Sequence, residues 1–127
     1  MDIKLDEKLC ANYPLIFRDR HAPMNETCMC WGFECDDGWY NIIDQLCNKI
    51  QSHINFCKID QVVATQVKEK YGTLRFYYDC GDRYIDGLVA MAESMSAVTC
   101  EVCGNSGKTL GGGWIKTLCE IHASEGV

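Results

Sequence analysis

The chain has 127 residues, of which 47% are hydrophobic, and a formal net charge of −6. This length and composition predict one globular domain with a modest core, and they exclude an intrinsically disordered chain. The acidity disfavours non-specific binding to duplex DNA, because that binding depends on Lys and Arg side chains at the phosphates.

The ten cysteines raise the question of disulfide bonds. The sequence opens with mixed charges and without the apolar run of a secretory signal peptide, so we expect a reducing cytoplasm and free thiols. Because no stretch approaches the roughly 20 apolar residues of a transmembrane helix, we expect no membrane partner.

In the N-terminal segment, Leu5, Leu9 and Tyr13 recur at four-residue spacing. The spacing predicts a short amphipathic helix over about residues 3–12, which Pro14 ends. Residues 14–36 show no clear period, and we expect a long structured loop there.

Three cysteines of this loop, Cys28, Cys30 and Cys35, follow His21. Three thiols and an imidazole could ligate a second metal ion. The single residue between Cys28 and Cys30 is an uncommon spacing for zinc, and the neighbouring side chains are apolar. We therefore favour packing of reduced thiols over a second metal site.

Carboxylates occur in the same stretch, at Glu34, Asp36 and Asp37. Together with His21 they could form an acid–base site or a metal-dependent hydrolytic site. Helix capping by the two aspartates is the simpler interpretation, because both stand just ahead of a strong helical pattern.

That pattern predicts the second helix, over about residues 38–55. Its apolar residues recur at three- and four-residue steps and should face the core; they are Trp39, Ile42, Ile43, Leu46, Ile50 and Ile54. We interpret Cys47 and Cys57 as small buried hydrophobic residues.

Between about residues 62 and 79 the hydrophobic period changes to two, which predicts a β-hairpin that turns at Tyr71 and Gly72. One face should be buried, and the other should gather a polar patch of Gln66, Lys68, Arg75 and Tyr77. A solvated outer face is the ordinary interpretation. Lys and Arg flanked by aromatic rings would also suit an anion or a nucleotide.

Asp82 can cap a third helix over about residues 83–97. The apolar residues of this helix also repeat at three- and four-residue steps: Ile85, Leu88, Ala92 and Met95. The helix leads directly to the C-terminal cysteines.

The strongest chemical signal is Cys100-x2-Cys103, fifteen intervening residues, and Cys119-x2-His122. This is the ligand spacing of a zinc site, and the intervening residues can return as a short hairpin. Three thiolates and one imidazole complete a tetrahedron, so we expect one structural zinc per chain without a position for a catalytic water. Gly104 stands just past the first turn, where the backbone often needs a positive φ.

These elements predict an α+β fold. We expect a small single domain in which helices pack on a β-hairpin, with a C-terminal zinc knuckle or ribbon-like element. The α+β core should span residues 1–98, and the zinc-binding tail should span residues 99–127 of the same compact domain.

Four motifs run through most of the chain: Glu-Thr-Cys-Met-Cys-Trp-Gly-Phe-Glu-Cys at 26–35, Asp-Gly-Trp-Tyr at 37–40, Gln-Val-Lys-Glu-Lys-Tyr-Gly-Thr-Leu-Arg-Phe-Tyr at 66–77, and the cysteine motifs at 99–122. In these motifs the chain resembles a family of small zinc-binding proteins encoded by tailed phages and prophages. The resemblance covers about residues 10–123 and implies a phage accessory protein that acts in the host cytoplasm. It implies no particular reaction. Asp36 departs from the glycine that we expect in relatives.

The favoured hypothesis is a non-enzymatic binding protein that counters host defence by capturing a nucleotide-type signal or a host protein, with a homo-oligomer as one arrangement. The expected ligand-binding residues are Lys68, Arg75, Tyr77, Trp31, Trp39 and Tyr71. One alternative is a metal-dependent phosphodiester hydrolase that uses the carboxylates at 34–37. Another is a nucleic-acid or transcription adaptor that uses the zinc tail, although residues 100–127 hold two lysines against three glutamates.

Overall fold

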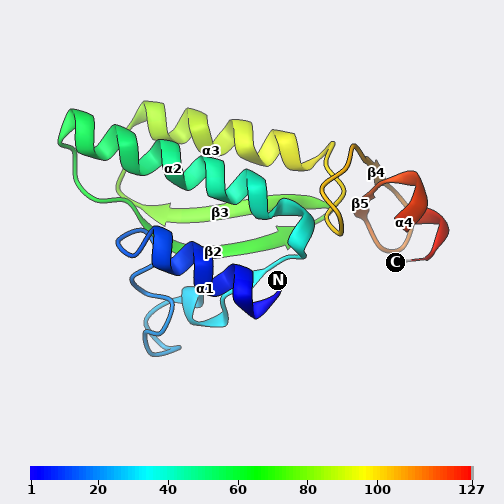
Figure 1. Ribbon diagram of the computed structural model, residues 1–127, viewed down its shortest axis with the longest axis horizontal. Helices are drawn as coiled ribbons and strands as arrows, with labels where there is room; N and C mark the ends of the chain where they lie inside the picture. Colours follow the sequence, from blue (N-terminus) through cyan, green and yellow to red (C-terminus); the bar gives the residue numbers. More distant parts are fainter. Residues whose placement is uncertain (127) are drawn as a thin grey trace.

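A three-stranded sheet with the order β1-β2-β3 is packed against helices, and a smaller two-stranded unit lies at one end of the molecule (Figure 1). The computed structural model describes residues 1–126, and Val127, the last residue of the predicted tail, lies outside the described residues. The α+β class is confirmed. The elements are α1 (Ile3–Asn12), the 3₁₀ turn η1 (Cys28–Trp31), β1 (Phe33–Glu34), the 3₁₀ turn η2 (Asp37–Trp39), α2 (Tyr40–Cys57), β2 (Val63–Lys70), β3 (Thr73–Asp79), α3 (Arg83–Ser96), β4 (Lys108–Leu110), β5 (Lys116–Leu118) and α4 (Glu120–Ser124).

The antiparallel β2–β3 hairpin forms most of the sheet, and its register sorts the side chains into two faces. Val67 lies opposite Phe76, and both are buried. The next pair along the strands, Lys68 and Arg75, points to the other face because side chains alternate along a strand. Strand β1 pairs in parallel with β2, which places Glu34 opposite Lys68 on the same open face.

The predicted alternation breaks at the start of β2. A β-bulge between Ala64 and Gln66 shifts the register, so Val63 and Ala64 are buried in succession. An extra residue in one strand of this kind increases the local twist and re-aims the side chains that follow. Beyond the bulge, Gln66 lies opposite Tyr77, as the polar patch requires.

Helix α3 packs along β3 and satisfies backbone groups of that strand. The N–H of Leu74 donates to Ser96 Oγ at 2.8 Å, and the N–H of Phe76 donates to Glu93 Oε2 at 3.0 Å. Both acceptors belong to α3 and point toward the sheet. An edge strand covered in this way is protected from pairing with another chain.

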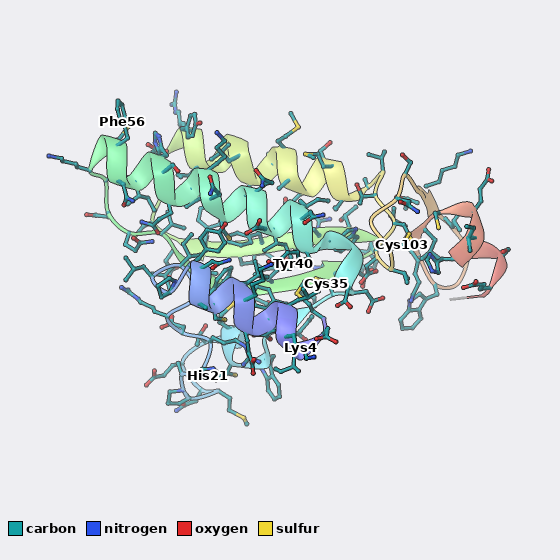
Figure 2. The ribbon with its side chains drawn as sticks, in the orientation of Figure 1. Lys4, His21, Cys35, Tyr40, Phe56 and Cys103 are labelled. Atoms are coloured by element: carbon teal, nitrogen blue, oxygen red, sulfur yellow. The ribbon has the colours of Figure 1, made fainter. Side chains whose placement is uncertain are left out.

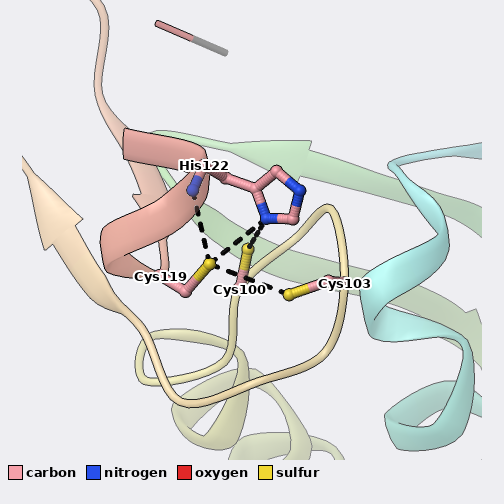
Figure 3. A group of neighbouring side chains, drawn as sticks. All are labelled: Cys100, Cys103, Cys119 and His122. Carbon is pink, nitrogen blue, oxygen red and sulfur yellow. Dashed lines mark hydrogen bonds between the residues drawn. The ribbon is translucent and has the colours of Figure 1, made fainter. Parts of the chain in front are cut away.

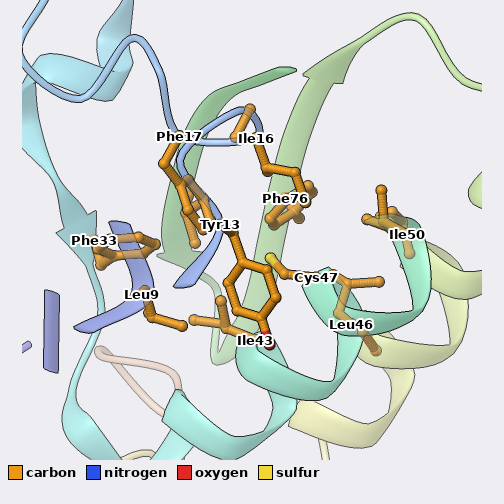
Figure 4. Packing of buried hydrophobic residues seen from close by; sticks show 14 of the residues in the cluster. Leu9, Tyr13, Ile16, Phe17, Phe33, Ile43, Leu46, Cys47, Ile50 and Phe76 are labelled. Atoms are coloured by element: carbon orange, nitrogen blue, oxygen red, sulfur yellow. The ribbon is translucent and has the colours of Figure 1, made fainter. Parts of the chain in front are cut away.

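The core lies between the sheet and the helices, and Figure 4 shows its packing. Leu9 and Tyr13 enter it from α1, Ile43 from α2 and Phe76 from β3. Tyr13 also donates its hydroxyl to Asp44 Oδ1 of α2 at 2.7 Å. Burying side chains of this size stabilises the fold by about 1.5–3 kcal/mol each, which accounts for the position of α1 against α2.

The predicted cap of α3 is present, whereas the predicted cap of α2 is not. Asp82 accepts from the N–H of Ile85 and caps α3, as expected. The capping prediction for Asp36 and Asp37 is wrong, because η2 precedes α2 and Trp39 occupies the cap position. Asp37 Oδ1 instead accepts the N–H of Asp2 at 2.7 Å. Among the helices of residues 1–126, none combines the length and apolar character needed to cross a bilayer.

Candidate functional site

The first half of the C-terminal Cys/His cluster is a tight turn after α3. The N–H of Cys100 donates to the carbonyl of Asn105 at 2.7 Å, and the N–H of Gly104 donates to the carbonyl of Cys100 at 2.9 Å. Gly104 has a φ of +84°, so the positive φ predicted for this position is confirmed. These bonds hold Cys100 and Cys103 on the same side of the turn.

The second half of the cluster is the start of a short helix. Strands β4 and β5 pair as an antiparallel hairpin, which returns the chain to Cys119 as the spacing suggested. Cys119 is the N-cap of α4, and its Sγ accepts from the N–H of His122 at 3.5 Å. The imidazole of His122 is thereby placed on the first turn of α4, beside the three sulfurs.

The four candidate ligand atoms lie within 4.8 Å of one another (Figure 3). His122 Nδ1 lies 3.5 Å from Cys100 Sγ and 3.2 Å from Cys119 Sγ. Cys103 Sγ lies 3.8 Å from Cys119 Sγ. The sequence motif therefore folds into one convergent Cys3His group, which could hold a metal ion.

Two of these separations agree with a tetrahedral ion held by sulfur and nitrogen ligands, whereas the 3.2 Å between His122 Nδ1 and Cys119 Sγ is shorter. At the tetrahedral angle, bond lengths of about 2.3 Å for sulfur and about 2.0 Å for nitrogen place two sulfurs about 3.8 Å apart and a sulfur about 3.5 Å from a nitrogen. The observed 3.8 Å between Cys103 and Cys119 agrees with the first value, and the 3.5 Å between Cys100 and His122 agrees with the second. Three sulfurs and one imidazole nitrogen are a donor set that could hold a metal ion.

The surrounding backbone prepares the cluster for a cation. Burial would raise the pKa of Cys100, yet nearby N–H groups favour its thiolate and lower the pKa to about 6; they belong to Cys119, Cys103 and Val102. The hydrogen bond from His122 lowers the pKa of Cys119 in the same way. Metal binding to cysteine needs the thiolate form, so surroundings that lower the pKa of Cys100 and Cys119 favour a bound cation.

The tail that carries the cluster is joined to the body through the segment before α2. Gly38 N–H donates to the carbonyl of Glu101 at 2.7 Å, and Asp36 N–H donates to the Glu101 carboxylate at 3.0 Å. Burial raises the pKa of this carboxyl. Trp39 Nε1 donates to the carbonyl of Thr99 at 2.9 Å. The two residues that flank Cys100 therefore contact the segment that leads into α2.

The position of Trp39 differs from its predicted role as a ligand-binding residue. Trp39 is 0% exposed and belongs to the core, so it cannot present its ring to a ligand. The aromatic ring was expected to lie near the polar face of the hairpin. Trp39 also belongs to the apolar repeat that was predicted to face the core, and that part of the prediction is correct.

The polar patch predicted on the hairpin is present on the open face of the sheet. Lys68 lies directly opposite Arg75, and Gln66 lies directly opposite Tyr77. Gln66 Nε2 also donates to Glu34 Oε1 at 3.3 Å. The patch is thus a mixed polar surface in which two cations stand side by side.

A shallow depression of about 510 Å³ lies on this face, bounded by both the hairpin and residues 26–28 of the preceding loop. Lys68, Lys70 and Tyr77 line it. The other predicted aromatic residues lie elsewhere: Tyr71 in the hairpin turn and Trp31 in η1, with 68% and 61% exposure. Lys70, which was not among the predicted site residues, also lines the depression.

The cysteines of the N-terminal loop differ in how far they are buried. Cys28 is exposed and Cys35 is buried, where burial and then the charge of Glu101 raise its pKa to about 12. His21 lies on the loop, away from Cys35 (Figure 2). Within residues 1–126, the C-terminal cluster is the one group of His, Cys, Asp and Glu side chains that could hold a metal.

A contact that was not predicted from the sequence lies at the C-terminal end of α2. His53 lies 3.6 Å from Cys57 Sγ through Nδ1 and 2.8 Å from Asp82 Oδ2 through Nε2. The four-residue spacing of His53 and Cys57 on a helix was the available signal. Cys57 is exposed, so its interpretation as a buried hydrophobic residue is wrong; the helix ends there and the side chain faces solvent.

Comparisons of the chain with family models, with curated proteins and with solved structures find no match. The resemblance to small phage-encoded proteins therefore stays a prediction. The candidate sites are therefore the Cys3His cluster and the open face of the sheet.

Proposed function

We propose that the protein is a non-enzymatic binding protein that captures a small phosphate-bearing ligand of the nucleotide type on the open face of its sheet. The observation that carries this proposal is the direct pairing of Lys68 with Arg75 across β2 and β3. Like charges opposite each other destabilise a sheet, and a bound anion between them would relieve that cost.

The two cations are available to a ligand. Among residues 1–126 the salt bridges are those of Arg20 with Asp6 and of His53 with Asp82, so neither Lys68 nor Arg75 takes part in one. Arg75 Nε is buried and has no hydrogen-bond partner within the described chain. The half-buried Arg75 guanidinium is thus not neutralised within the described chain, and a guanidinium can bind two phosphate oxygens at once.

The neighbouring residues favour a nucleotide over a bare anion. Tyr77 is 41% exposed and lines the depression with Lys70, so an aromatic ring and two lysines surround the same space. A base can stack on the ring while its phosphates contact the cations. Gln66 and Glu34 offer neutral and acidic acceptors for the hydroxyl or amino groups of a nucleoside.

We propose zinc as the metal of the Cys3His cluster, with a structural role. Four protein ligands fill a tetrahedral ion and leave no position for a reacting water, which supports binding over catalysis. The cluster lies beside the hairpin turn, where Thr117 Oγ1 donates to the carbonyl of Gly72 at 2.6 Å. The metal would thus fix one end of the hairpin that presents the cations.

The resemblance to proteins of tailed phages supplies the biological context of the proposal. In that context the protein acts in the cytoplasm of an infected bacterium, and the captured nucleotide is a signal of host defence. A homo-oligomer would place two open faces in one assembly. Capture of a host protein is the competing outcome.

The test is a titration of the metal-loaded protein with a panel of mononucleotides and cyclic dinucleotides, followed by calorimetry and by mass analysis of the recovered ligand. We expect stoichiometric binding, unaltered ligand, and loss of binding when Lys68 and Arg75 are both replaced by Ala. Lys49→Ala is the matched control, because this exposed lysine lies on α2. If the double variant binds the ligand as well as the parent protein does, the proposed site is wrong. Turnover of a nucleotide would favour the hydrolase alternative.

A further inference from the structure

The end of the molecule opposite the metal cluster holds a second chemical arrangement, formed by Cys57, His53 and Asp82. Cys57 is the last residue of α2, and His53 lies one turn earlier on the same helix. Asp82 is the N-cap of α3. The loop before α3 therefore brings a carboxylate to the imidazole, and the helix brings the imidazole to the thiol.

The hydrogen bonds fix which nitrogen of His53 carries the proton. His53 Nε2 lies 2.8 Å from Asp82 Oδ2, and an ionised carboxylate only accepts hydrogen bonds. Its contact with His53 is the first cause that lowers the pKa of Asp82, so the carboxylate is the form that the site favours. The neutral imidazole therefore carries its proton on Nε2, and Nδ1 has a free lone pair.

That lone pair faces the thiol. His53 Nδ1 lies 3.6 Å from Cys57 Sγ, a distance at which a thiol donates a hydrogen bond to nitrogen. Tyr84 stacks on the imidazole with ring centroids 4.2 Å apart, which holds the ring in this orientation. A nucleophile beside a base that a third group orients is the arrangement of an activated thiol.

The position of the thiol makes the base necessary. A helix C-terminus carries partial negative charge and disfavours a thiolate, so a nucleophilic thiol at this position needs a base beside it. Cys57 is exposed, so a reagent carried by a large partner can reach it. Phe56, which is 88% exposed, projects from the same end of α2 (Figure 2).

We propose that Cys57 is a nucleophilic site that accepts an acyl group from a thioester, with His53 as its general base and Asp82 as the positioning residue. Cys57 Sγ bonds to the carbonyl carbon while its proton passes to His53 Nδ1. The carbon–sulfur bond of the donor thioester then breaks, and the departing thiolate takes that proton. The products are S-acylated Cys57 and a free thiol, without any change in oxidation state.

The test measures acetylation of the metal-loaded full chain by the thioester S-acetyl-N-acetylcysteamine, with the modified cysteine located by peptide mass mapping. Cys80 is the internal control, because it is also exposed and lies two residues before Asp82. We expect Cys57 to react about tenfold or more faster than Cys80, since a general base contributes at least this much. Equal rates at the two cysteines would overturn the proposal.

Two variants separate this activity from a structural tie between α2 and α3. His53→Gln keeps the capacity for hydrogen bonding but takes up no proton, so the rate at Cys57 should fall to that at Cys80. Asp82→Asn keeps an oxygen for the helix cap, and its amide can direct the ring proton onto Nδ1, so the rate should also fall. If either folded variant reacts like the parent protein, the assignment is wrong.

Discussion

The backbone of Gly38 lies so close to that of Cys100 that a Cβ at position 38 would come within 2.2 Å of the Cys100 carbonyl oxygen. The N–H of Gly38 also donates to the carbonyl of Glu101 at 2.7 Å. The η2 turn and the turn that carries Cys100 and Cys103 therefore contact each other backbone to backbone. Only glycine fits this contact, which fixes the tail on the body.

Replacing Gly38 by Ala should destabilise the protein by about 1–3 kcal/mol, the usual cost of forcing extra atoms into a packed contact. The free energy of unfolding in urea measures the effect. Gly87→Ala is the control, because an added Cβ there meets nothing within 4 Å among residues 1–126. As Gly87 lies in α3, that change should stabilise the helix by about 0.5–1 kcal/mol. A Gly38→Ala variant as stable as the parent would mean that the close contact is absent in solution.

Removing the metal should unfold the tail and leave the body folded. The tail has a small core of its own, in which Leu118, Cys100 and Cys119 are the buried members. Such a core cannot hold a structure without a metal, whereas the main core is separate from the ligands. Hydrogen exchange after chelation should show fast exchange over 100–126 and slow exchange in α2.

The variants for this prediction are Cys103→Ser and Cys28→Ser, two exposed cysteines of which only the first belongs to the cluster. Cys103→Ser should lose metal from the purified protein, and Cys28→Ser should keep one ion per chain. Metal content by elemental analysis decides the outcome. Full metal content in the Cys103 variant would exclude this cluster as the site.

The like-charge pair on the sheet should reduce stability in the absence of ligand. Arg75→Glu places an acid opposite Lys68 and should therefore stabilise the free protein by roughly 0.2–1 kcal/mol. The same change should abolish nucleotide binding, because it removes a cation and adds a negative charge. Thermal denaturation and calorimetry of one preparation measure both effects. A variant that is less stable and still binds would contradict the role given to this pair.

Tyr13 should make stability fall in alkali. Burial, followed by the hydrogen bond to Asp44, raises the pKa of the Tyr13 hydroxyl above its ordinary value of 10.0. The folded state thus holds the neutral phenol, and this stabilisation is complete below the unfolded pKa and is lost as pH rises toward the folded one. Tyr13→Phe should cost about 1–2 kcal/mol at neutral pH and less above pH 10 or so. Parallel pH dependences of the two proteins would show that Tyr13 does not titrate in this way.

The helices, the hairpin and the metal ligands were predictable because each is a local signal. Asp82 and the apolar repeat after it specify α3, and the spacing of Cys100, Cys103, Cys119 and His122 specifies one cluster. The polar face of the hairpin followed from the period of two, because side chains alternate along strands.

The remaining features depend on contacts between distant residues. Trp39 was predicted both to face the core and to contact a ligand; it is fully buried, and no local pattern indicates that its indole N–H donates to the carbonyl of Thr99 in the tail. The carboxylate of Asp37 is used by Asp2, which no local pattern indicates. The approach of Asp82 to His53 likewise depends on how the loop before α3 packs on α2.

The most direct test of the proposed function is native mass spectrometry of the protein after purification from bacterial cells that contain nucleotides. The spectrum should show one zinc per chain and an added mass that corresponds to a phosphate-bearing ligand. The same preparation of the Lys68→Ala, Arg75→Ala double variant should show the zinc without the added mass. A ligand mass that persists in the double variant, or a parent protein that binds none of the nucleotides supplied, would contradict the account.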